Sequence, residues 1–295
     1  MEAGWKRKYR RHAWMSDLIL LMLLLLPLFL LSGCGNNAEA AMDRNSEVIR
    51  LASDYEQDDL GYWQLEAFAQ ALQEKSDGAL TVQLYKKDVW SKAESFAAYL
   101  DAGSIEMVCM PMEEAILMQP SFAVYKQPYL FSGLQAVENY VLGVAGKEAL
   151  QQLPHGYYGI GLVADGYQYL VQQETIKSYS YGTLKRLAKI HELDGAAVYA
   201  AQAIYQLHPL IASKAWWDGL TEQEQLWIQD AFTESLQNAF VYQKDIAGQR
   251  LYESGITVQS VLSPELTDYT EQYMMQREAY FSIHGDMRLQ FIGVL

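Results

Sequence analysis

The sequence predicts an α/β protein that follows an N-terminal targeting segment. Three observations support this prediction. A basic stretch and a short apolar run open the chain, residues 48–110 alternate between strand-like and helix-like patterns, and 51% of all residues are hydrophobic while 20% are charged. That balance is typical of folded proteins and excludes disorder over most of the chain.

The charge balance limits the possible partners. The chain has 36 acidic and 22 basic residues and a net charge of −14. An acidic protein repels the phosphate backbone, so nucleic acid is not an expected partner. The two cysteines, Cys34 and Cys109, are too few for a disulfide scaffold or a cysteine-rich zinc site.

The first 33 residues are interpreted as a signal peptide. The basic stretch WKRKYRRH (5–12) precedes an apolar run from Leu18 to Leu31 that contains Pro27. This run of 14 residues is shorter than the ~20 residues that a membrane-spanning helix needs. The pattern is therefore that of a secretory leader, with a plain transmembrane anchor as the alternative.

Leu31-Ser32-Gly33-Cys34 resembles the bacterial lipobox, in which a cysteine is lipidated and becomes the new N-terminus. The resemblance implies that Cys34 carries lipid and holds the protein on the outer face of the cell membrane. Residues 34–47 are polar and rich in alanine, and they are interpreted as a flexible tether. Residues 48–295 then form the body.

The first part of the body predicts a strand–helix–strand–helix–strand order. Strands are expected at 48–53, 80–85 and 105–110. The first helix is indicated by apolar residues at helical spacing, and the second by Ser91 and Glu94, which form a capping box. This order predicts a parallel sheet with helices on its faces, which binds ligands at the carboxyl ends of its strands. The apolar stripe of the first helix is Leu65, Phe68, Ala69 and Leu72.

The remaining elements are longer. A helical pattern begins near Gly133, and a strand follows at 157–163. Thr221 and Glu224 form a second capping box ahead of a long helix that is expected to continue to about residue 254. A strand at 256–261 and a helix that begins at Pro264 complete the body. The stripe of the long helix is Ile228, Ala231, Phe232, Leu236, Ala239 and Phe240.

Several stretches of the body resemble the DctP-type extracytoplasmic solute-binding proteins of TRAP transporters. SDGALTVQLY (76–85), AGSIEMVCM (102–110) and SFAVYKQPYLF (121–131) are similar to three motifs of that family. Each motif is weak alone, and their order and spacing over 48–262 make the set specific. The later elements that match are ELDGA (192–196), IASKAWWDGLTEQEQ (211–225) and GITV (255–258).

The resemblance implies a type II periplasmic-binding-protein-like fold with two α/β lobes, a cleft and a long bridging helix. Lobe 1 is expected mainly in 48–131 with part of 205–250, and lobe 2 mainly in 132–204 and 251–295. It also implies a monomer that closes on a small solute, needs no cofactor or metal, and delivers the solute to membrane permease subunits.

The chain departs from the family at two places. In Asp165-Gly166-Tyr167-Gln168, Gln168 stands where the family has the arginine that holds an organic acid. The stretch from Gln168 to Asp194 is also short, so the second lobe is expected to be truncated. Glutamine lacks the charge-assisted contact that an arginine makes with a carboxylate, so the usual dicarboxylate ligand is not expected.

The ligand-binding residues expected from these patterns lie at strand ends or in the matched motifs. Gln168 is expected to face the ligand, and aromatic side chains are expected to form the walls of the cleft. The acidic loop 54–59 is either part of the cleft or a solvated helix start. The full set is Gln168, Tyr167, Tyr129, Tyr55, Asp58 and Trp90.

The sequence predicts no enzyme. The segment Gly159–Ala164 fits a loose dinucleotide pattern, but it lies inside a predicted strand, and no histidine has the spacing of a metal site. The predicted function is capture of a small organic solute for a TRAP-type permease. The alternative is a degenerate binding lipoprotein that acts as a sensor or as a protein-interaction module without transport.

Overall fold

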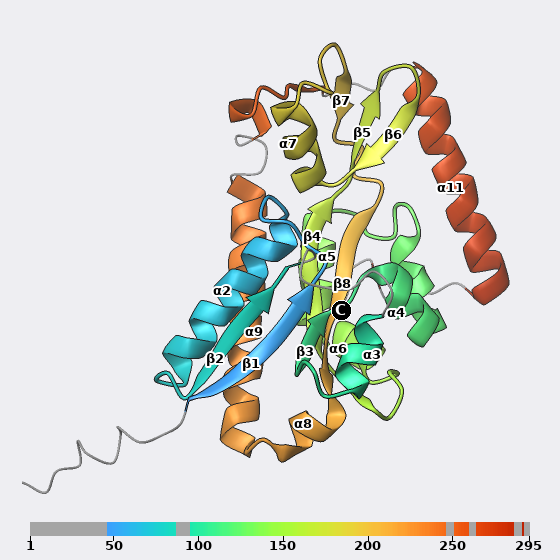
Figure 1. Cartoon of the computed structure of the whole chain (residues 1–295). Coiled ribbons are helices and arrows are strands. Elements are labelled where there is room, and N and C mark those ends of the chain that lie inside the picture. Colours follow the sequence, from blue (N-terminus) through green and yellow to red (C-terminus); the bar gives the residue numbers. More distant parts are fainter. Residues whose placement is uncertain (1–45, 87–94, 246–250, 260–263, 286–290, 292–295) are drawn as a thin grey trace, which may run out of the picture. The chain divides into compact units, whose positions relative to one another are not determined.

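The computed structural model of the protein describes residues 46–86, 95–245, 251–259, 264–285 and 291 (Figure 1). All of them belong to one unit, Ser46–Leu295. The predicted leader 1–33, the lipidation site Cys34, nearly all of the tether 34–47, and Trp90 lie outside the described residues. Within the described part of the chain, no helix has the length and apolarity that a membrane crossing requires.

A five-stranded sheet carries most of the core, with the strand order β2-β1-β3-β8-β4. β1 pairs in parallel with β2 and β3, whereas β8 pairs antiparallel with β3 and β4. The predicted parallel arrangement of the first three strands is therefore confirmed. The strands are β1 (Glu47–Ser53), β2 (Leu80–Tyr85), β3 (Met107–Cys109), β4 (Tyr157–Tyr167) and β8 (Tyr205–Ser213).

Short helices connect and cover these strands. The helix before β3 is capped by Ser95, whose Oγ accepts from Ala98 N at 3.2 Å; the predicted start at Ser91 lies outside the described residues. The helices around this sheet are α2 (Leu60–Lys75), α3 (Phe96–Asp101), α4 (Met112–Met118), the 3-10 helix η2 (Pro120–Lys126), α5 (Leu134–Leu142), α6 (Val144–Leu150) and α8 (Lys214–Gly219).

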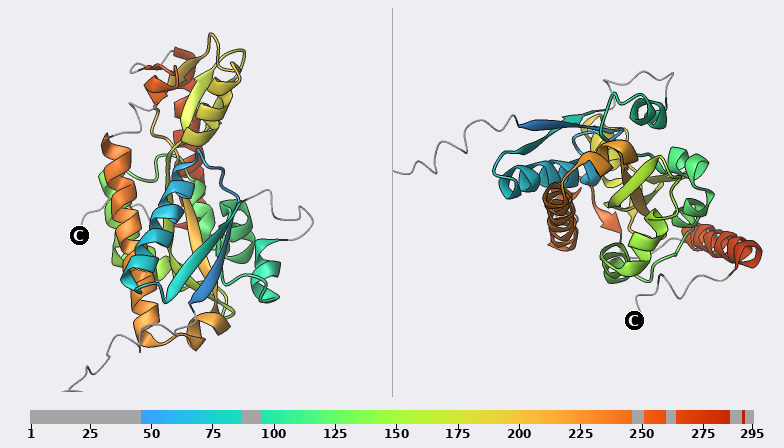
Figure 2. Two further views of the ribbon diagram at one scale, coloured as in Figure 1. Left: turned by 60° about the vertical axis from the view of Figure 1, so that its left-hand side comes forward. Right: turned by 90° about the horizontal axis from the view of Figure 1, so that it is seen from below.

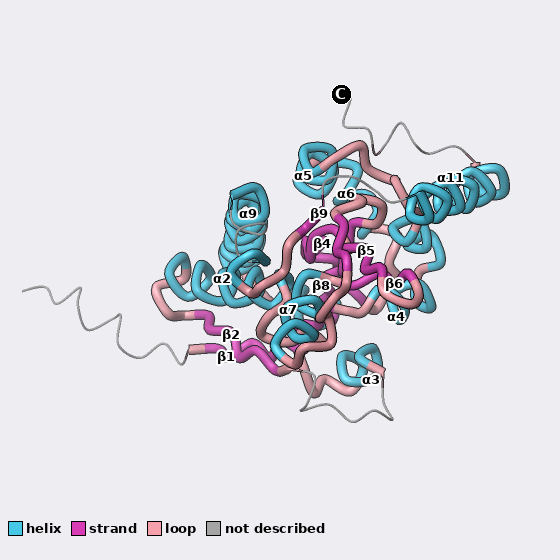
Figure 3. Tube along the Cα trace, turned by 90° about the horizontal axis from the view of Figure 1, so that it is seen from above, coloured by secondary structure: helices cyan, strands magenta, loops and turns pink. Residues whose placement is uncertain are grey.

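The long helix α9 (Glu222–Asp245) packs beside α2, as the views in Figures 2 and 3 show. Its predicted capping box is confirmed, because Thr221 N donates to Glu224 Oε2 at 2.8 Å and Glu224 N donates to Thr221 Oγ1 at 3.3 Å. All six residues of its predicted apolar stripe are buried. The ring of Phe232 packs against that of Phe68 in α2, with 6.2 Å between the ring centroids. Helical periodicity thus identified the contact face.

A second sheet of four strands has the order β6-β5-β7-β9. Two small hydrophobic clusters lie against it. One includes Leu184 and Val198 together with Leu60 of α2, and the other includes Leu170 and Leu266. The strands and helices of this region are β5 (Tyr169–Gln172), β6 (Ile176–Tyr179), α7 (Tyr181–Lys189), β7 (Ala197–Tyr199), β9 (Val258–Gln259) and α11 (Pro264–His284).

The chain runs between the two sheets three times, twice through short passages and once from β8 to β9 through α8 and α9. Gln168 alone separates β4 from β5, and residues 200–204 connect β7 to β8. The two passages contact each other, since Gln168 N donates to Ile204 O at 2.9 Å. Because β4 pairs along its length with β8, and the buried residues of α5 and α6 belong to the same core, residues 134–167 lie with the first sheet. The chain therefore first passes from one sheet to the other at Gln168, and the lobe boundaries expected from the sequence stay a prediction.

Candidate functional site

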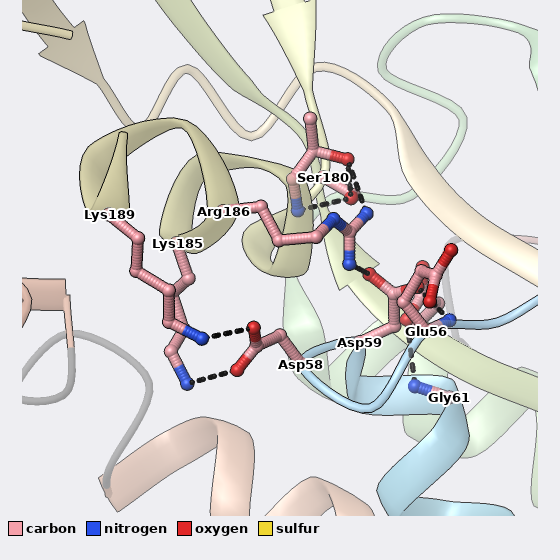
Figure 4. Close-up of polar contacts among 10 residues, drawn as sticks. Glu56, Asp58, Asp59, Gly61, Ser180, Lys185, Arg186 and Lys189 are labelled. Atoms are coloured by element: carbon pink, nitrogen blue, oxygen red, sulfur yellow. Dashed lines mark hydrogen bonds and ion pairs between the residues drawn. The ribbon is translucent and has the colours of Figure 1, made fainter. Parts of the chain in front are cut away.

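The loop between β1 and α2 is bound to helix α7 of the second sheet by ion pairs (Figure 4). The carboxylate of Asp58 lies 3.2 Å from Lys185 Nζ and 2.6 Å from Lys189 Nζ. Burial alone would raise the pKa of Asp58, but hydrogen bonds from Lys189 and Lys185 outweigh burial and lower it. Asp58 is thus an ionised carboxylate that already has two cationic partners.

Asp59 makes a second and more buried pair with the same helix. Its Oδ1 lies 3.0 Å from Arg186 Nη1, and its Oδ2 accepts from Glu56 N at 2.8 Å. Gly182 allows this close approach, because a Cβ added to it would lie 2.0 Å from Asp59 Oδ1 and 2.8 Å from Asp59 N. We call these contacts of Asp58 and Asp59 with α7 the charge clamp.

Asp59 of the charge clamp acts electrostatically on buried titratable side chains of β4 and β8, and Tyr55 of the loop after β1 packs beside them. The ring of Tyr55 packs 5.2 Å from that of His208, and the buried Asp165 accepts from Gly61 N at 2.7 Å. Burial lowers the pKa of His208 to about 4, although Glu113 and Asp59 oppose that shift. Burial, followed by the charge of Asp59, raises the pKa of Asp165 well above its ordinary value.

A cavity of about 400 Å³ lies where the two sheets join. Of the residues that line it, Arg277 of α11 is the only one that carries a charge, and its Nη1 donates to Tyr129 O at 3.0 Å. We call it the junction cavity. Its lining consists of Tyr129, Leu130, Phe131, Ser132, Gly133, Tyr167, Ala201, Gln202 and Arg277.

Two of the expected ligand-binding residues, Tyr129 and Tyr167, thus meet in the junction cavity. Gln168 is adjacent in sequence but does not line it; its Oε1 accepts from Ser178 Oγ at 2.5 Å. Tyr55 and Asp58 lie elsewhere, in the loop between β1 and α2, and Asp58 is part of the charge clamp. Of the two interpretations of the acidic loop, the helix start is correct for Asp59, which is the N-cap residue of α2, but Asp58 and Asp59 are ion-paired and not solvated.

Some residues of these two places were not expected from the sequence. Helix α7, which the sequence patterns do not predict, supplies the cations of the charge clamp: Lys185, Arg186 and Lys189. The signal for Arg277 was visible as a spacing of four in the C-terminal helix, where Tyr269, Tyr273 and Arg277 share one face. In the described part of the chain, no group of three or more His, Cys, Asp or Glu side chains is placed to hold a metal ion.

Comparisons with known proteins agree with this fold. Residues 52–179 match the profile of the bacterial extracellular solute-binding proteins of family 7, DctP. No curated protein matches the chain. The sequence resemblance to TRAP solute-binding proteins is confirmed by the family match, and the two-lobed α/β fold is confirmed by the similar structures described next.

Several solved structures share the fold at low identity. A TRAP periplasmic solute-binding protein from Desulfovibrio desulfuricans, with bound sn-glycerol-3-phosphate, has 16% identity and a TM-score of 0.65 over 80% of this chain and 94% of that one. A sugar acid binding protein from Advenella mimigardefordensis, in complex with galactonate, has 16% identity and a TM-score of 0.65 over 83% and 96%. An apo open TRAP protein from Marinobacter aquaeolei has 13% identity and a TM-score of 0.67 over 83% and 98%.

Proposed function

We propose that this chain, a TRAP-type solute-binding protein by its matched segment and its fold, captures a small organic solute between its two lobes. The solute is held by reversible closure without covalent chemistry. Tyr129 and Tyr167 contact it, while Tyr55 and Asp58 support the loop that α7 covers. Gln168 lies at the passage on which the lobes move relative to each other.

One observation carries this proposal. Helix α7 of the second sheet contacts the loop that follows β1, at the carboxyl end of the parallel strands, through three cations and two carboxylates. Ligands of α/β proteins bind at that end of the strands and at the boundary between lobes. The contact therefore connects the two lobes at the end of the strands where α/β proteins bind their ligands.

The proposed setting follows from the sequence. The predicted leader and Cys34 support an extracytoplasmic protein that lipid holds at the membrane surface, and the structures that share its fold support TRAP-type permease subunits as the partners that receive the solute.

The alternative function, a sensor or protein-interaction module without transport, is favoured by one contact. Gln168, at the family's arginine position, does not line the junction cavity, and its Oε1 instead accepts from Ser178 Oγ.

A thermal-shift screen of the full chain, purified in detergent, tests the proposal. The panel contains succinate, D-glucuronate, galactonate, sn-glycerol-3-phosphate, glucose and choline, each at millimolar concentration. A solute present at 100 times its Kd stabilises the folded state by about 2.7 kcal/mol, so we expect at least one solute to raise Tm by roughly 5 °C. A folded protein whose Tm responds to no member of a wider panel of acids, sugars and amines would contradict solute capture.

A further inference from the structure

We propose that a pocket at the end of the first sheet where β1 begins binds the phosphate of an anionic phospholipid headgroup, with Lys147 of α6 and Lys214 of α8 as its cations. We call it the basal pocket. The inference rests on the lipid attachment that the proposed function assigns to Cys34, and it concerns a place outside the solute cleft. It gives the body a defined orientation on the membrane that holds it.

The basal pocket has a volume of about 480 Å³, within the range of ligand pockets. The described residues that line it include two lysines and no aspartate or glutamate, although the chain has 36 acidic and 22 basic residues. The buried side chains of Leu150 and Ile160 also line it and suit the glycerol carbons of a headgroup. The pocket thus attracts one anion locally, while the net charge of −14 opposes a general adsorption of the body to an anionic surface.

Both lysines can accept an anion as a partner. Lys147 is exposed and makes no ion pair within the described part of the chain. Lys214 pairs with Asp218, whose carboxylate is 56% exposed and turns to water when a phosphate takes its place. Exposed pairs of this kind are weak, so the exchange costs little. Each ammonium group offers three donors, and its contacts with phosphate oxygens are charge-assisted.

Tyr158 supplies an ordered wall and a hydrogen-bond donor. Its ring stacks on that of Trp217 in α8, with 4.0 Å between the ring centroids and an interplanar angle of 10°. Its hydroxyl accepts from Gln229 Nε2 at 3.5 Å, so its own proton remains available for a phosphate oxygen. Burial raises the pKa of Tyr158 although Lys214 opposes that shift, so the phenol keeps its proton at neutral pH.

The basal pocket lies at the opposite end of the sheet from the charge clamp. Because β4 runs antiparallel to β8, and β8 antiparallel to β3, β4 is parallel to β1 and starts at the same end. Tyr157, at the start of β4, lines the basal pocket, whereas Tyr167, at its end, lines the junction cavity. A strand of 11 residues separates the two places by about 30 Å. A headgroup held in the basal pocket therefore turns the cleft end of the sheet away from the membrane.

The chain enters the body beside this pocket. Glu47 opens β1, and its Oε1 accepts from Trp216 Nε1 at 2.8 Å, two residues after Lys214 in α8 (Figure 1). Ser46 follows Cys34 by 12 residues, which span at most about 40 Å when fully extended. A lipid on Cys34 therefore keeps the pocket within reach of the membrane surface, where the local concentration of headgroups fills even a weak site. Basic pockets close to a membrane bind anionic headgroups in this way.

Isothermal titration calorimetry of the lipidated protein in a neutral detergent tests the pocket. The titrants are the anionic headgroup glycerophosphoglycerol, the zwitterionic headgroup glycerophosphocholine and inorganic phosphate. We expect glycerophosphoglycerol to bind at least about tenfold more tightly than glycerophosphocholine. The double variant Lys147→Gln, Lys214→Gln should weaken this binding at least about tenfold, because two charge-assisted contacts are lost, and Lys147→Arg should keep it. Lys75→Gln, at a lysine of α2 that pairs with Glu234, is the matched control and should leave the affinity unchanged.

Nanodiscs test whether the anion comes from the membrane. The lipidated protein carries a donor fluorophore on a cysteine in place of Gln223, an exposed residue in the first turn of α9, and the lipid headgroups carry the acceptor. Cys109 is buried and is not labelled. We expect more energy transfer in nanodiscs that contain phosphatidylglycerol than in nanodiscs of phosphatidylcholine alone. The double lysine variant should remove this difference.

The outcomes separate this inference from the proposed function. Binding of glycerophosphoglycerol that the double variant leaves unchanged, or that is no tighter than binding of glycerophosphocholine, overturns the basal pocket while solute capture stands. Tighter binding of inorganic phosphate, together with equal energy transfer in both kinds of nanodisc, overturns the membrane as the source of the anion. Absence of lipid on Cys34 in mass spectrometry overturns the membrane role as well.

Two further readouts keep the test decisive. A solute that shifts Tm of the wild type should shift Tm of the double variant equally, and loss of that shift would overturn the placement of the pocket outside the cleft. If the double variant does not fold, Lys147→Gln alone decides. Its side chain makes no ion pair within the described residues, so an unchanged affinity in that variant would overturn the role of Lys147.

Discussion

His208 shows how a single buried side chain can set the pH response of this protein. Its ring lies against Tyr55, its Nδ1 is buried without a hydrogen-bond partner among the described residues, and its pKa falls from 6.5 to about 4. Between those two pH values, the unfolded chain takes up a proton at this residue and the folded chain does not. Stability therefore falls as pH decreases from 6.5 to 4.

We expect His208→Gln to reduce this loss of stability. Urea denaturation at pH 7.5 and pH 5 should show a smaller decrease in the free energy of unfolding for the variant than for the wild type. The control is His155→Gln, at an exposed histidine, which should keep the wild-type slope. Asp165 has a raised pKa, so its contribution to the free energy of unfolding decreases as pH rises, opposite to that of His208. The wild type and both variants keep Asp165, so comparing their pH slopes removes this contribution. An identical pH slope in His208→Gln and the wild type would contradict the burial of a neutral imidazole.

At the same scale, the sequence located some site residues and misplaced others. Tyr55 and Tyr167 are expected near strand ends and lie there, because strand ends follow from local periodicity. Tyr129, expected from a matched motif, lies between η2 and α5. The partner of Gln168 could not be expected, since Ser178 reaches it only through the pairing of β5 with β6. The ion pairs of Asp58 likewise depend on a helix more than 120 residues later in the chain.

At the scale of elements, the contact between α7 and the loop that follows β1 depends on a glycine. A methyl group at Gly182 would overlap Oδ1 of Asp59 and crowd the backbone of Asp58 and Asp59. Because neither the helix backbone nor the loop backbone can move independently, the two elements would separate and weaken the charge clamp.

We expect Gly182→Ala to lower the free energy of unfolding by about 1–3 kcal/mol, the usual cost of overpacking. Alanine favours a helix over glycine by about 1 kcal/mol, so a loss would occur against that local gain. Gly219→Ala in α8, where an added Cβ meets no atom within 4 Å, is the matched control and should not destabilise. Equal stability of Gly182→Ala and the wild type in chemical denaturation would show that α7 does not pack this closely.

The elements that the sequence predicted well are those with local signals. The apolar stripes of α2 and α9, the capping box at Thr221 and the order of the first three strands are all found. The pairing of β4 with β8 was not predicted, because it joins segments about 50 residues apart and periodicity carries no information on pairing partners. Helix α7 was also missed, since its short amphipathic pattern has few apolar residues.

At the scale of the whole described body, two sheets meet at the charge clamp, at the junction cavity, and at Leu60 of α2, which packs in a hydrophobic cluster of the second sheet. The passages at Gln168 and at residues 200–204 are the covalent connections from β4 to β5 and from β7 to β8. Two bodies joined by short passages and held by exposed and half-buried ion pairs can change their angle at modest cost. Solute capture by closure needs this property.

The distance between the two bodies, measured by electron paramagnetic resonance, tests that claim most directly. Spin labels are attached to cysteines at Gln73 of α2 and Glu174 of the β5–β6 turn, both exposed, in a Cys34→Ser background. Cys109 is buried and its pKa is raised well above the usual range, so it stays unlabelled. We expect the solute that gives the largest thermal shift to narrow the distribution of distances between the labels and to shorten its mean. In Gly182→Ala we expect the same change, from a distribution that is wider than in the wild type before the solute is added. A distribution that the bound solute leaves unchanged in both proteins would contradict a clamp that closes on its ligand.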